Sequence, residues 1–205
     1  MDQVVKWFDD HKFIAFIRSG SAEDAEEMLK AALAGGIRIF EISIQTPQAI
    51  RLIENYSKRE GILVGAGSVT DGEMVQRVIG AGAKFVASQY TDRDIISVTK
   101  HYDSVVIQGA LTPTEAVNAY QLGADFIKLY PVDSMGGVEY VKDLRAALPF
   151  LKLIVDGEPT LDKAFEYLKH CVAVTLREAI FERPLVRTDN WGQMTERARQ
   201  FTQRL

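Results

Sequence analysis

Residues 124–137 have the sequence ADFIKLYPVDSMGG, in which Lys128 interrupts an apolar, aromatic-rich run of strand length. A parallel strand covered on both faces is expected to be almost continuously hydrophobic, and a lysine is rarely buried there without a partner. Burial disfavours the ammonium form, so one interpretation is a neutral amine that attacks a ketone and forms a Schiff base. The other is a structural ion pair, or a lysine that extends to solvent from the end of the strand.

The composition limits the class of protein. The 205 residues are 47% hydrophobic and 25% charged, which is typical of a soluble globular protein and predicts one domain spanning residues 1–205. A net charge of −4 gives no basic surface, so neither nucleic acid nor an anionic membrane is expected as a partner. No apolar run reaches membrane-spanning length, and the first ten residues do not resemble a signal peptide, so we expect a cytoplasmic protein.

Metal and dinucleotide sites are not predicted. The single cysteine, Cys171, excludes an internal disulfide and a cysteine-rich metal site, and no metal-ligand spacing is present. The segment at residues 65–67, Gly-Ala-Gly, lacks the third glycine and the acidic residue of a dinucleotide-binding fingerprint. We therefore expect no cofactor. The histidines are expected at the surface, in helix termini or loops: His11, His101 and His170.

Short β-branched runs alternate along the chain with longer amphipathic segments that often end at glycine. Strands are expected at residues 13–18, 37–44, 62–68, 84–89, 104–110, in the lysine-containing run, and at 151–155 and 171–176. Helices are expected at residues 2–10, from Ser21 to Gly35, at 47–60, 72–81 and 92–102, from Thr112, and at 138–148, 161–170 and 191–203.

Eight strands that alternate with helices predict a parallel sheet. This number of units favours an α/β fold of the (β/α)8 TIM-barrel type, with an additional helix at each end of the chain, over an open doubly wound sheet. In such a barrel the active site lies at the carboxyl ends of the strands. Polar residues at or near predicted strand ends are therefore candidates for the site: Arg18, Ser68, Gln89, Gln108 and Asp156.

Glu41 is a second unusual residue, because strand alternation places it on the same face as Ile37 and Ile39. It is either the partner of Arg18 or Lys128 in a structural ion pair, or a general acid and base. A carboxylate and a lysine near strand ends of one barrel are what proton transfer beside a Schiff base requires.

Five sequence blocks carry a resemblance that runs from Phe13 to about Ile180. The chain resembles the pyruvate-dependent class I aldolases of the 2-keto-3-deoxy-6-phosphogluconate (KDPG) and 4-hydroxy-2-oxoglutarate (KHG) aldolase family. Each block is modest alone, but their order and spacing are specific. The blocks are AGGIRIFEI at residues 34–42, VGAGSV at 64–69, AGAKFVAS at 81–88, LTPTE at 111–115 and FIKLYP at 126–131.

The resemblance implies a (β/α)8 barrel that assembles as a homotrimer and acts on a small keto acid. It also implies roles for individual residues. Lys128 corresponds to the Schiff-base lysine and Glu41 to the general acid and base. Ser68 stands in place of a threonine that binds the pyruvate carboxylate, and Tyr130 in place of an aromatic residue beside the imine.

The chain departs from the family around the substrate carboxylate. Gln45 stands where many members carry an arginine, and Arg18 matches an arginine found in some members and is expected to substitute for it. Gln89 replaces the proline of a Ser-Pro pair, and Gln108 replaces the proline of a Pro-Gly pair. We include all four residues among the candidate substrate-binding residues.

The larger departure is in the phosphate-binding loops. A Thr-Gly-Gly segment has become Asp156-Gly157-Glu158, and a Gly-x-Gly-Ser segment has become residues 175–178, TLRE. Glycine-rich loops bind phosphate through backbone N–H groups, which the carboxylates of Asp156, Glu158 and Glu178 oppose. Arg177 is the one nearby cation, so a phosphorylated substrate is expected to be cleaved less efficiently than by glycine-loop relatives.

Two function classes remain open from the sequence. The first is a class I aldolase, a carbon–carbon lyase that cleaves a 2-keto-4-hydroxy acid of the KHG or KDPG type to pyruvate and an aldehyde. The second is a non-catalytic or repurposed keto-acid-binding barrel of the same family. Lys128 and Glu41 together favour the aldolase.

Overall fold

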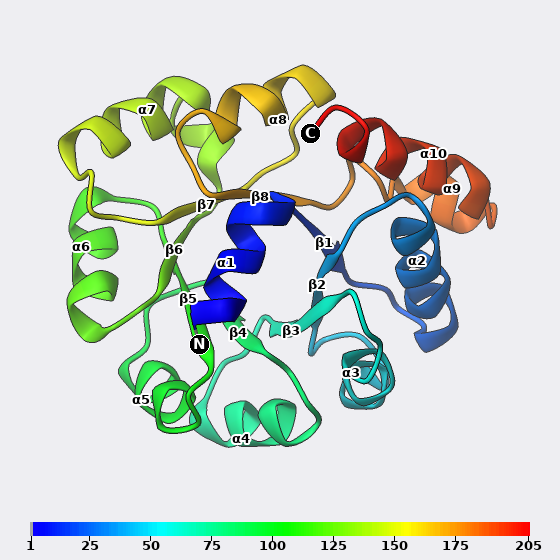
Figure 1. The fold of residues 1–205 in the computed structure, drawn as a ribbon, viewed down its shortest axis with the longest axis horizontal. Helices are drawn as coiled ribbons and strands as arrows, with labels where there is room; N and C mark the ends of the chain where they lie inside the picture. The colour runs from blue at the N-terminus through cyan, green and yellow to red at the C-terminus, as the bar shows by residue number, and fades with distance from the viewer. Residues whose placement is uncertain (1) are drawn as a thin grey trace.

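The computed structural model describes residues 2–205, and its eight strands form one closed barrel in which each strand pairs in parallel with the next in sequence and β8 pairs with β1. The predicted (β/α)8 barrel is confirmed (Figure 1). The strands are β1 (Phe13–Ile17), β2 (Ile39–Ser43), β3 (Leu63–Gly67), β4 (Phe85–Ser88), β5 (Val105–Ala110), β6 (Phe126–Leu129), β7 (Leu153–Asp156) and β8 (Ala173–Leu176).

Helices surround the barrel and connect its strands (Figure 1). The predicted terminal helices are present as α1 and α10. The helices are α1 (Asp2–His11), α2 (Ala22–Ala34), α3 (Ala49–Ser57), α4 (Gly72–Gly80), α5 (Arg93–His101), α6 (Pro113–Leu122), α7 (Val138–Ala147), α8 (Leu161–Leu168), α9 (Arg183–Arg187) and α10 (Trp191–Thr202). No helix among residues 2–205 is both long and apolar enough to cross a membrane.

The structure differs from the prediction in two short helices and in two element boundaries. The sequence pattern missed the 3-10 helix η1 (Val132–Met135) and the five-residue helix α9, because both are too short to show a helical period. Helix α3 was predicted from Pro47, but it begins at Ala49, because Gln48 adopts a left-handed backbone conformation with φ 58° that a helix cannot contain. Cys171, expected to start a strand, lies before β8 and is partly buried.

The barrel interior is closed at its amino-terminal end by α1, which crosses the centre of the ring in Figure 1. The Phe8 side chain is fully buried, with its ring centroid 5.3 Å from that of Phe85 and 4.8 Å from that of Phe126. The same interior cluster contains Ile14, Ile39, Leu63, Ala87, Val105, Ile107, Ile154 and Ala173. This apolar layer fills the lower half of the barrel, so polar inward-facing residues are confined to the carboxyl end.

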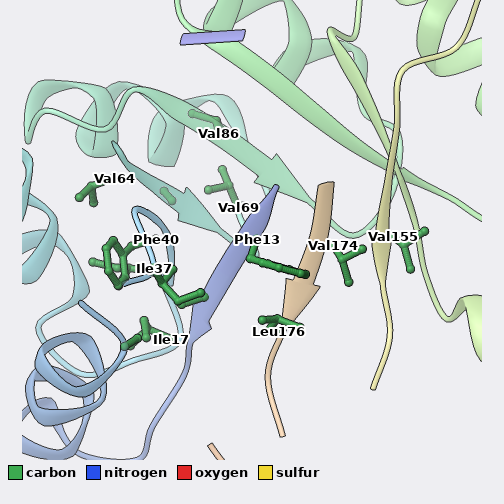
Figure 2. Packing of buried hydrophobic residues seen from close by; sticks show 14 of the residues in the cluster. Phe13, Ile17, Ile37, Phe40, Val64, Val69, Val86, Val155, Val174 and Leu176 are labelled. Carbon is green, nitrogen blue, oxygen red and sulfur yellow. The ribbon is translucent and has the colours of Figure 1, made fainter. Parts of the chain in front are cut away.

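The other faces of the strands pack against the helices in a second, larger apolar layer. Figure 2 shows Phe13 of β1 close to Val174 and Leu176 of the neighbouring strand β8. The Phe13 ring also makes edge contacts with Phe165 of α8 and Phe201 of α10, at centroid distances of 5.6 and 5.4 Å. With both faces buried, every strand is nearly all apolar, as expected of a parallel sheet.

Candidate active site

The two residues singled out by the sequence meet inside the barrel. The Lys128 Nζ atom of β6 lies 2.6 Å from both carboxylate oxygens of Glu41 on β2, although 87 residues separate them in the chain. Both side chains are buried, with exposed fractions of 1% and 0%. A contact this short, shielded from water, permits direct proton transfer between the two groups.

Gly67 provides the space that Glu41 occupies. It pairs with Ser43 at the end of β2, and a Cβ atom at position 67 would lie 2.4 Å from Glu41 Oε1 and 2.8 Å from its Cγ. Any larger residue would displace the carboxylate. The glycine pattern at residues 65–67 therefore has a structural role unrelated to nucleotide binding.

Asp156 is a third buried charged residue in the barrel. One carboxylate oxygen lies 3.9 Å from Lys128 Nζ and the other 3.4 Å from Arg177 Nε, and the side chain is 0% exposed. Neither oxygen accepts a hydrogen bond from any residue that the structure describes. A buried carboxylate with unused acceptor sites beside a nucleophile is suited to contact a bound substrate.

The surroundings of Glu41 favour its protonated form. Burial is the largest cause and raises the pKa of the Glu41 carboxyl above its ordinary value. Lys128 opposes this increase and the nearby Asp156 carboxylate adds to it. A carboxyl group whose pKa is raised accepts a proton more readily than an exposed glutamate does.

Arg177 lies beside the buried Asp156 carboxylate, at the carboxyl end of the barrel. Its guanidinium carbon lies 5.1 Å from the centre of the Tyr130 ring and 5.8 Å from that of Phe16, within the range of cation–π contact. Phe16 was not singled out from the sequence. Alternation along β1 would have found it, because it is two residues before Arg18 on the same face.

A cavity of about 190 Å³ lies at the carboxyl end of the barrel, among residues at or just after the ends of the strands. Six of the predicted substrate-binding residues line it: Arg18, Gln45, Ser68, Gln89, Tyr130 and Arg177. A second cavity of about 780 Å³ shares three of them, Arg18, Gln45 and Arg177, and continues along Glu158, Glu178, Arg183 and Arg187. The structure thus brings these residues together where the strands end.

Ser68 is held by the neighbouring strand. It follows β3 with φ 58°, a conformation uncommon outside glycine, and its Oγ accepts a hydrogen bond of 3.1 Å from Ser43 Oγ. Ser68 lines the smaller cavity. Ser43 was not among the predicted site residues.

Gln108 is the one predicted substrate-binding residue that the structure places elsewhere. It lies within β5, not at its end, and its neighbour Ile107 belongs to the barrel interior, so Gln108 faces the helices. Its Oε1 accepts a hydrogen bond of 2.8 Å from the Asp92 amide at the start of α5. Gln108 caps a helix and we remove it from the site.

The acidic loop residues form a network at the rim of the larger cavity. Glu158 Oε1 lies 2.9 Å from Arg177 Nε, and Glu158 Oε2 accepts a hydrogen bond of 2.9 Å from the Glu178 amide. Asp133 Oδ2 in turn accepts a hydrogen bond of 3.2 Å from the Glu158 amide. Asp133 was missed from the sequence, because its contact depends on how the loops after β6 and β7 meet.

Comparison with known proteins identifies the family. The sequence pattern described as "Aldolase: KDPG and KHG aldolase" matches residues 4–196. The chain belongs to this aldolase family. A probable 2-dehydro-3-deoxy-6-phosphogalactonate aldolase of Rhizobium meliloti is 31% identical over 68% of the chain and 66% of its own length. A 2-dehydro-3-deoxy-phosphogluconate aldolase of Haemophilus influenzae is 24% identical over 94% of the chain and 92% of its own length.

A solved structure agrees with the barrel. The KDPG aldolase of Legionella pneumophila, with pyruvate captured at low pH as a covalent carbinolamine intermediate, is 25% identical, with a TM-score of 0.85 over 98% of each chain. The predicted family and the predicted activity, a class I aldolase and carbon–carbon lyase, are confirmed. No observation favours the non-catalytic alternative.

Substitution of Gly67 tests the geometry of the buried pair. We expect Gly67→Ala to push the Glu41 carboxylate away from Lys128 and to slow proton exchange at the pyruvate methyl group by at least about 10². The change should leave the barrel folded, because an added methyl in a packed interior costs about 1–3 kcal/mol. Exchange is followed by NMR in deuterium oxide.

The matched control is Gly80→Ala at the end of α4, where an added Cβ meets no atom within 4 Å. This variant should retain the wild-type exchange rate. Equal rates in all three proteins would show that the position of Glu41 does not depend on Gly67.

Proposed function

We propose that Lys128 forms a Schiff base with the C2 carbonyl of a 2-keto-4-hydroxy acid, and that Glu41 moves the protons that accompany cleavage of the C3–C4 bond. The products are pyruvate and an aldehyde. The observation that carries this proposal is the buried 2.6 Å contact between Lys128 Nζ and the Glu41 carboxylate. An amine must lose a proton to attack a ketone, and this contact provides the acceptor.

The first steps consume no external proton. Lys128 transfers a proton to Glu41, and the neutral amine attacks C2 to give a carbinolamine. Loss of the C2 hydroxyl as water, with a proton returned by Glu41, leaves a protonated imine. The raised pKa of the Glu41 carboxyl suits it to this reversible role.

Cleavage then uses the imine as the electron sink. Glu41 accepts the proton of the C4 hydroxyl, the C3–C4 bond breaks, and its electron pair moves toward the imine nitrogen to form an enamine. The aldehyde departs. Protonation of C3 by Glu41 regenerates the imine, and water releases pyruvate from Lys128. Because the lysine imine accepts the electrons, these steps need no cofactor.

Asp156 is proposed to stabilise the protonated imine. Its carboxylate lies 3.9 Å from Lys128 Nζ in a site closed to water, where an opposite charge has a larger effect than at the surface. The hydrogen-bond capacity of its oxygens is also suited to a hydroxyl of the substrate.

The remaining cavity residues are proposed to hold the substrate above the pair. Ser68, Arg18 and Gln45 would bind the C1 carboxylate, with Tyr130 against the imine and Gln89 and Arg177 toward the aldehyde end. The carbinolamine formed by pyruvate in the Legionella pneumophila relative supports a pyruvate product for this chain.

We also propose that the chain acts in the cytoplasm as a homotrimer, as the family resemblance implies. The expected measurement is a molar mass, by light scattering of the purified protein, of about three times the 22.9 kDa of one chain. A mass of one chain at assay concentration would contradict the trimer and leave the chemistry at Lys128 untouched.

Replacement of the lysine tests the Schiff base. Lys128→Arg keeps the positive charge beside Glu41 but supplies a guanidinium, which stays protonated and cannot act as the nucleophile. We expect turnover to be lost and the unfolding transition to remain cooperative. Treatment with pyruvate and borohydride should label the wild type covalently and leave this variant unlabelled.

The control is Lys84→Arg, because Lys84 is exposed just before β4. It should be labelled like the wild type. Activity in Lys128→Arg above a few per cent, about what contamination explains, would reject the nucleophile assignment. A wild type that pyruvate and borohydride fail to label would instead favour the keto-acid-binding alternative.

Replacement of Glu41 tests the proton transfer. Glu41→Gln keeps the size of the side chain but removes the base, so deuterium exchange at the pyruvate methyl group should slow by about 10²–10⁴. Borohydride trapping should decrease less. Glu139→Gln on the exposed face of α7 serves as control. Exchange at the wild-type rate in Glu41→Gln would make Glu41 structural and assign the proton to another group.

A further inference from the structure

The loops after β7 and β8 line the 780 Å³ cavity, on the side proposed to receive the aldehyde end of the substrate, and the loop after β6 contacts them through Asp133. In (β/α)8 enzymes the loops after the last two strands frequently bind phosphate, through backbone N–H groups and cationic side chains. The relatives named above are 2-dehydro-3-deoxy-phospho-sugar-acid aldolases.

In this chain one carboxylate already occupies these donors. Glu158 Oε2 accepts the hydrogen bond of the Glu178 amide at 2.9 Å, and Glu158 Oε1 lies 2.9 Å from Arg177 Nε. A backbone N–H and a guanidinium are the two kinds of group that hold a phosphate oxygen. Glu158 thus directs one oxygen to each group, as a hydrogen-bond acceptor for the Glu178 amide and as an ion-pair partner for Arg177, whose Nε makes no hydrogen bond to a residue that the structure describes.

The carboxylate is held in place from a third loop. The Glu158 amide donates to Asp133 Oδ2 at 3.2 Å, and Asp133 Oδ1 lies 2.5 Å from Lys163 Nζ and 3.0 Å from the Tyr167 hydroxyl. Gly157 is required at this junction, because a Cβ there would lie 2.8 Å from Asp133 Oδ2. The loop is therefore fixed by contacts on both sides of Glu158.

From these contacts we propose that Glu158 acts as an internal anion in the position where a substrate phosphate would bind, and that it selects substrates with an uncharged, hydroxyl-bearing aldehyde end. This inference rests on the proposed function and specifies its substrate class. The substrate is a 2-keto-4-hydroxy acid whose leaving aldehyde is a neutral polyol.

The surrounding charge supports this selection. Asp156 and Glu158 share Arg177, and the Glu178 carboxylate pairs with Arg183 at 3.3 Å, so three carboxylates face two guanidinium groups. Burial raises the pKa of the Glu158 carboxyl, which Arg177 and the Glu178 amide offset only in part. A further anion would add repulsion to a crowded group, whereas a hydroxyl donates to carboxylate oxygens at no such cost.

The strongest evidence against this proposal is a pair of arginines that line the same cavity. Arg18 and Arg187 both line it, and neither guanidinium group makes a hydrogen bond or ion pair with another residue that the structure describes. If these arginines hold an anionic aldehyde end, the phosphorylated substrate is preferred and Glu158 is only a structural residue. The experiment is designed to separate these two cases.

The test compares three substrates with each enzyme preparation: 2-keto-3-deoxygluconate, its 6-phosphate and 4-hydroxy-2-oxoglutarate. In the wild type, kcat/KM should be highest for the neutral 2-keto-3-deoxygluconate. Glu158→Gln removes the charge, keeps the size and frees part of the Arg177 charge, so the ratio of kcat/KM for the phosphorylated over the neutral substrate should increase by about tenfold or more. Because both substrates are measured on one preparation, any loss of folded enzyme cancels in the ratio.

Glu166→Gln is the matched control. Glu166 is a half-exposed glutamate on α8, paired with Lys169 at 2.7 Å, and its replacement should leave the ratio unchanged. An unchanged ratio in Glu158→Gln, or a wild-type preference for the phosphorylated substrate that Arg18→Gln with Arg187→Gln removes, would overturn the proposal. So would a wild-type preference for 4-hydroxy-2-oxoglutarate, whose aldehyde end carries a carboxylate.

Pyruvate exchange separates this failure from that of the proposed function. Deuterium exchange at the pyruvate methyl group needs the Schiff base and the proton transfer but no aldehyde end. If the wild type exchanges pyruvate protons but shows one of the contrary substrate patterns, or cleaves none of the three substrates, the proposed role of Glu158 is rejected and the proposed chemistry at Lys128 stands. If the wild type shows no exchange, the proposed chemistry itself is rejected.

Discussion

The contact between Lys128 and Glu41 places two charged groups in the barrel interior, away from water. Removing two charged groups from water costs several kcal/mol per ion, about as much as their attraction returns, so such a pair is weak support for stability. The barrel accommodates it with a glycine at position 67 and an apolar layer below it. A pair that is costly to bury and well shaped for proton transfer is best explained by catalysis.

The two ends of the barrel interior differ in composition: one is apolar and the other carries the buried charged residues. At the amino-terminal end, α1 inserts Phe8 against two aromatic rings, and the interior is entirely apolar. At the other end, the same inward-facing positions of the strands carry Glu41, Lys128 and Asp156. Because strand alternation continues without a break, each polar residue is held by the packing of the apolar residue two positions before it.

In our proposal, the network around Glu158 changes substrate specificity while the Lys128–Glu41 pair is kept. The donors that a phosphate would use are still present, as a backbone amide and the Arg177 guanidinium. A carboxylate from the chain accepts the hydrogen bond of the amide and pairs with the guanidinium. Under this proposal, substrate selection depends on one side chain and leaves the proposed Schiff-base lysine unaffected.

The barrel could be predicted from the sequence because eight alternating runs carry it in their local periodicity, and Lys128 and Glu41 could be identified because a charge in an apolar run is visible without neighbours. The contact between them could not, because it joins strands that are far apart in the chain. Gln108 was misplaced because the face that a strand residue presents depends on the register of the strand, and a shift of one residue reverses it. The contacts of Asp133 and Glu158 could not be predicted, because contacts between loops depend on positions in space and leave no periodic pattern in the sequence.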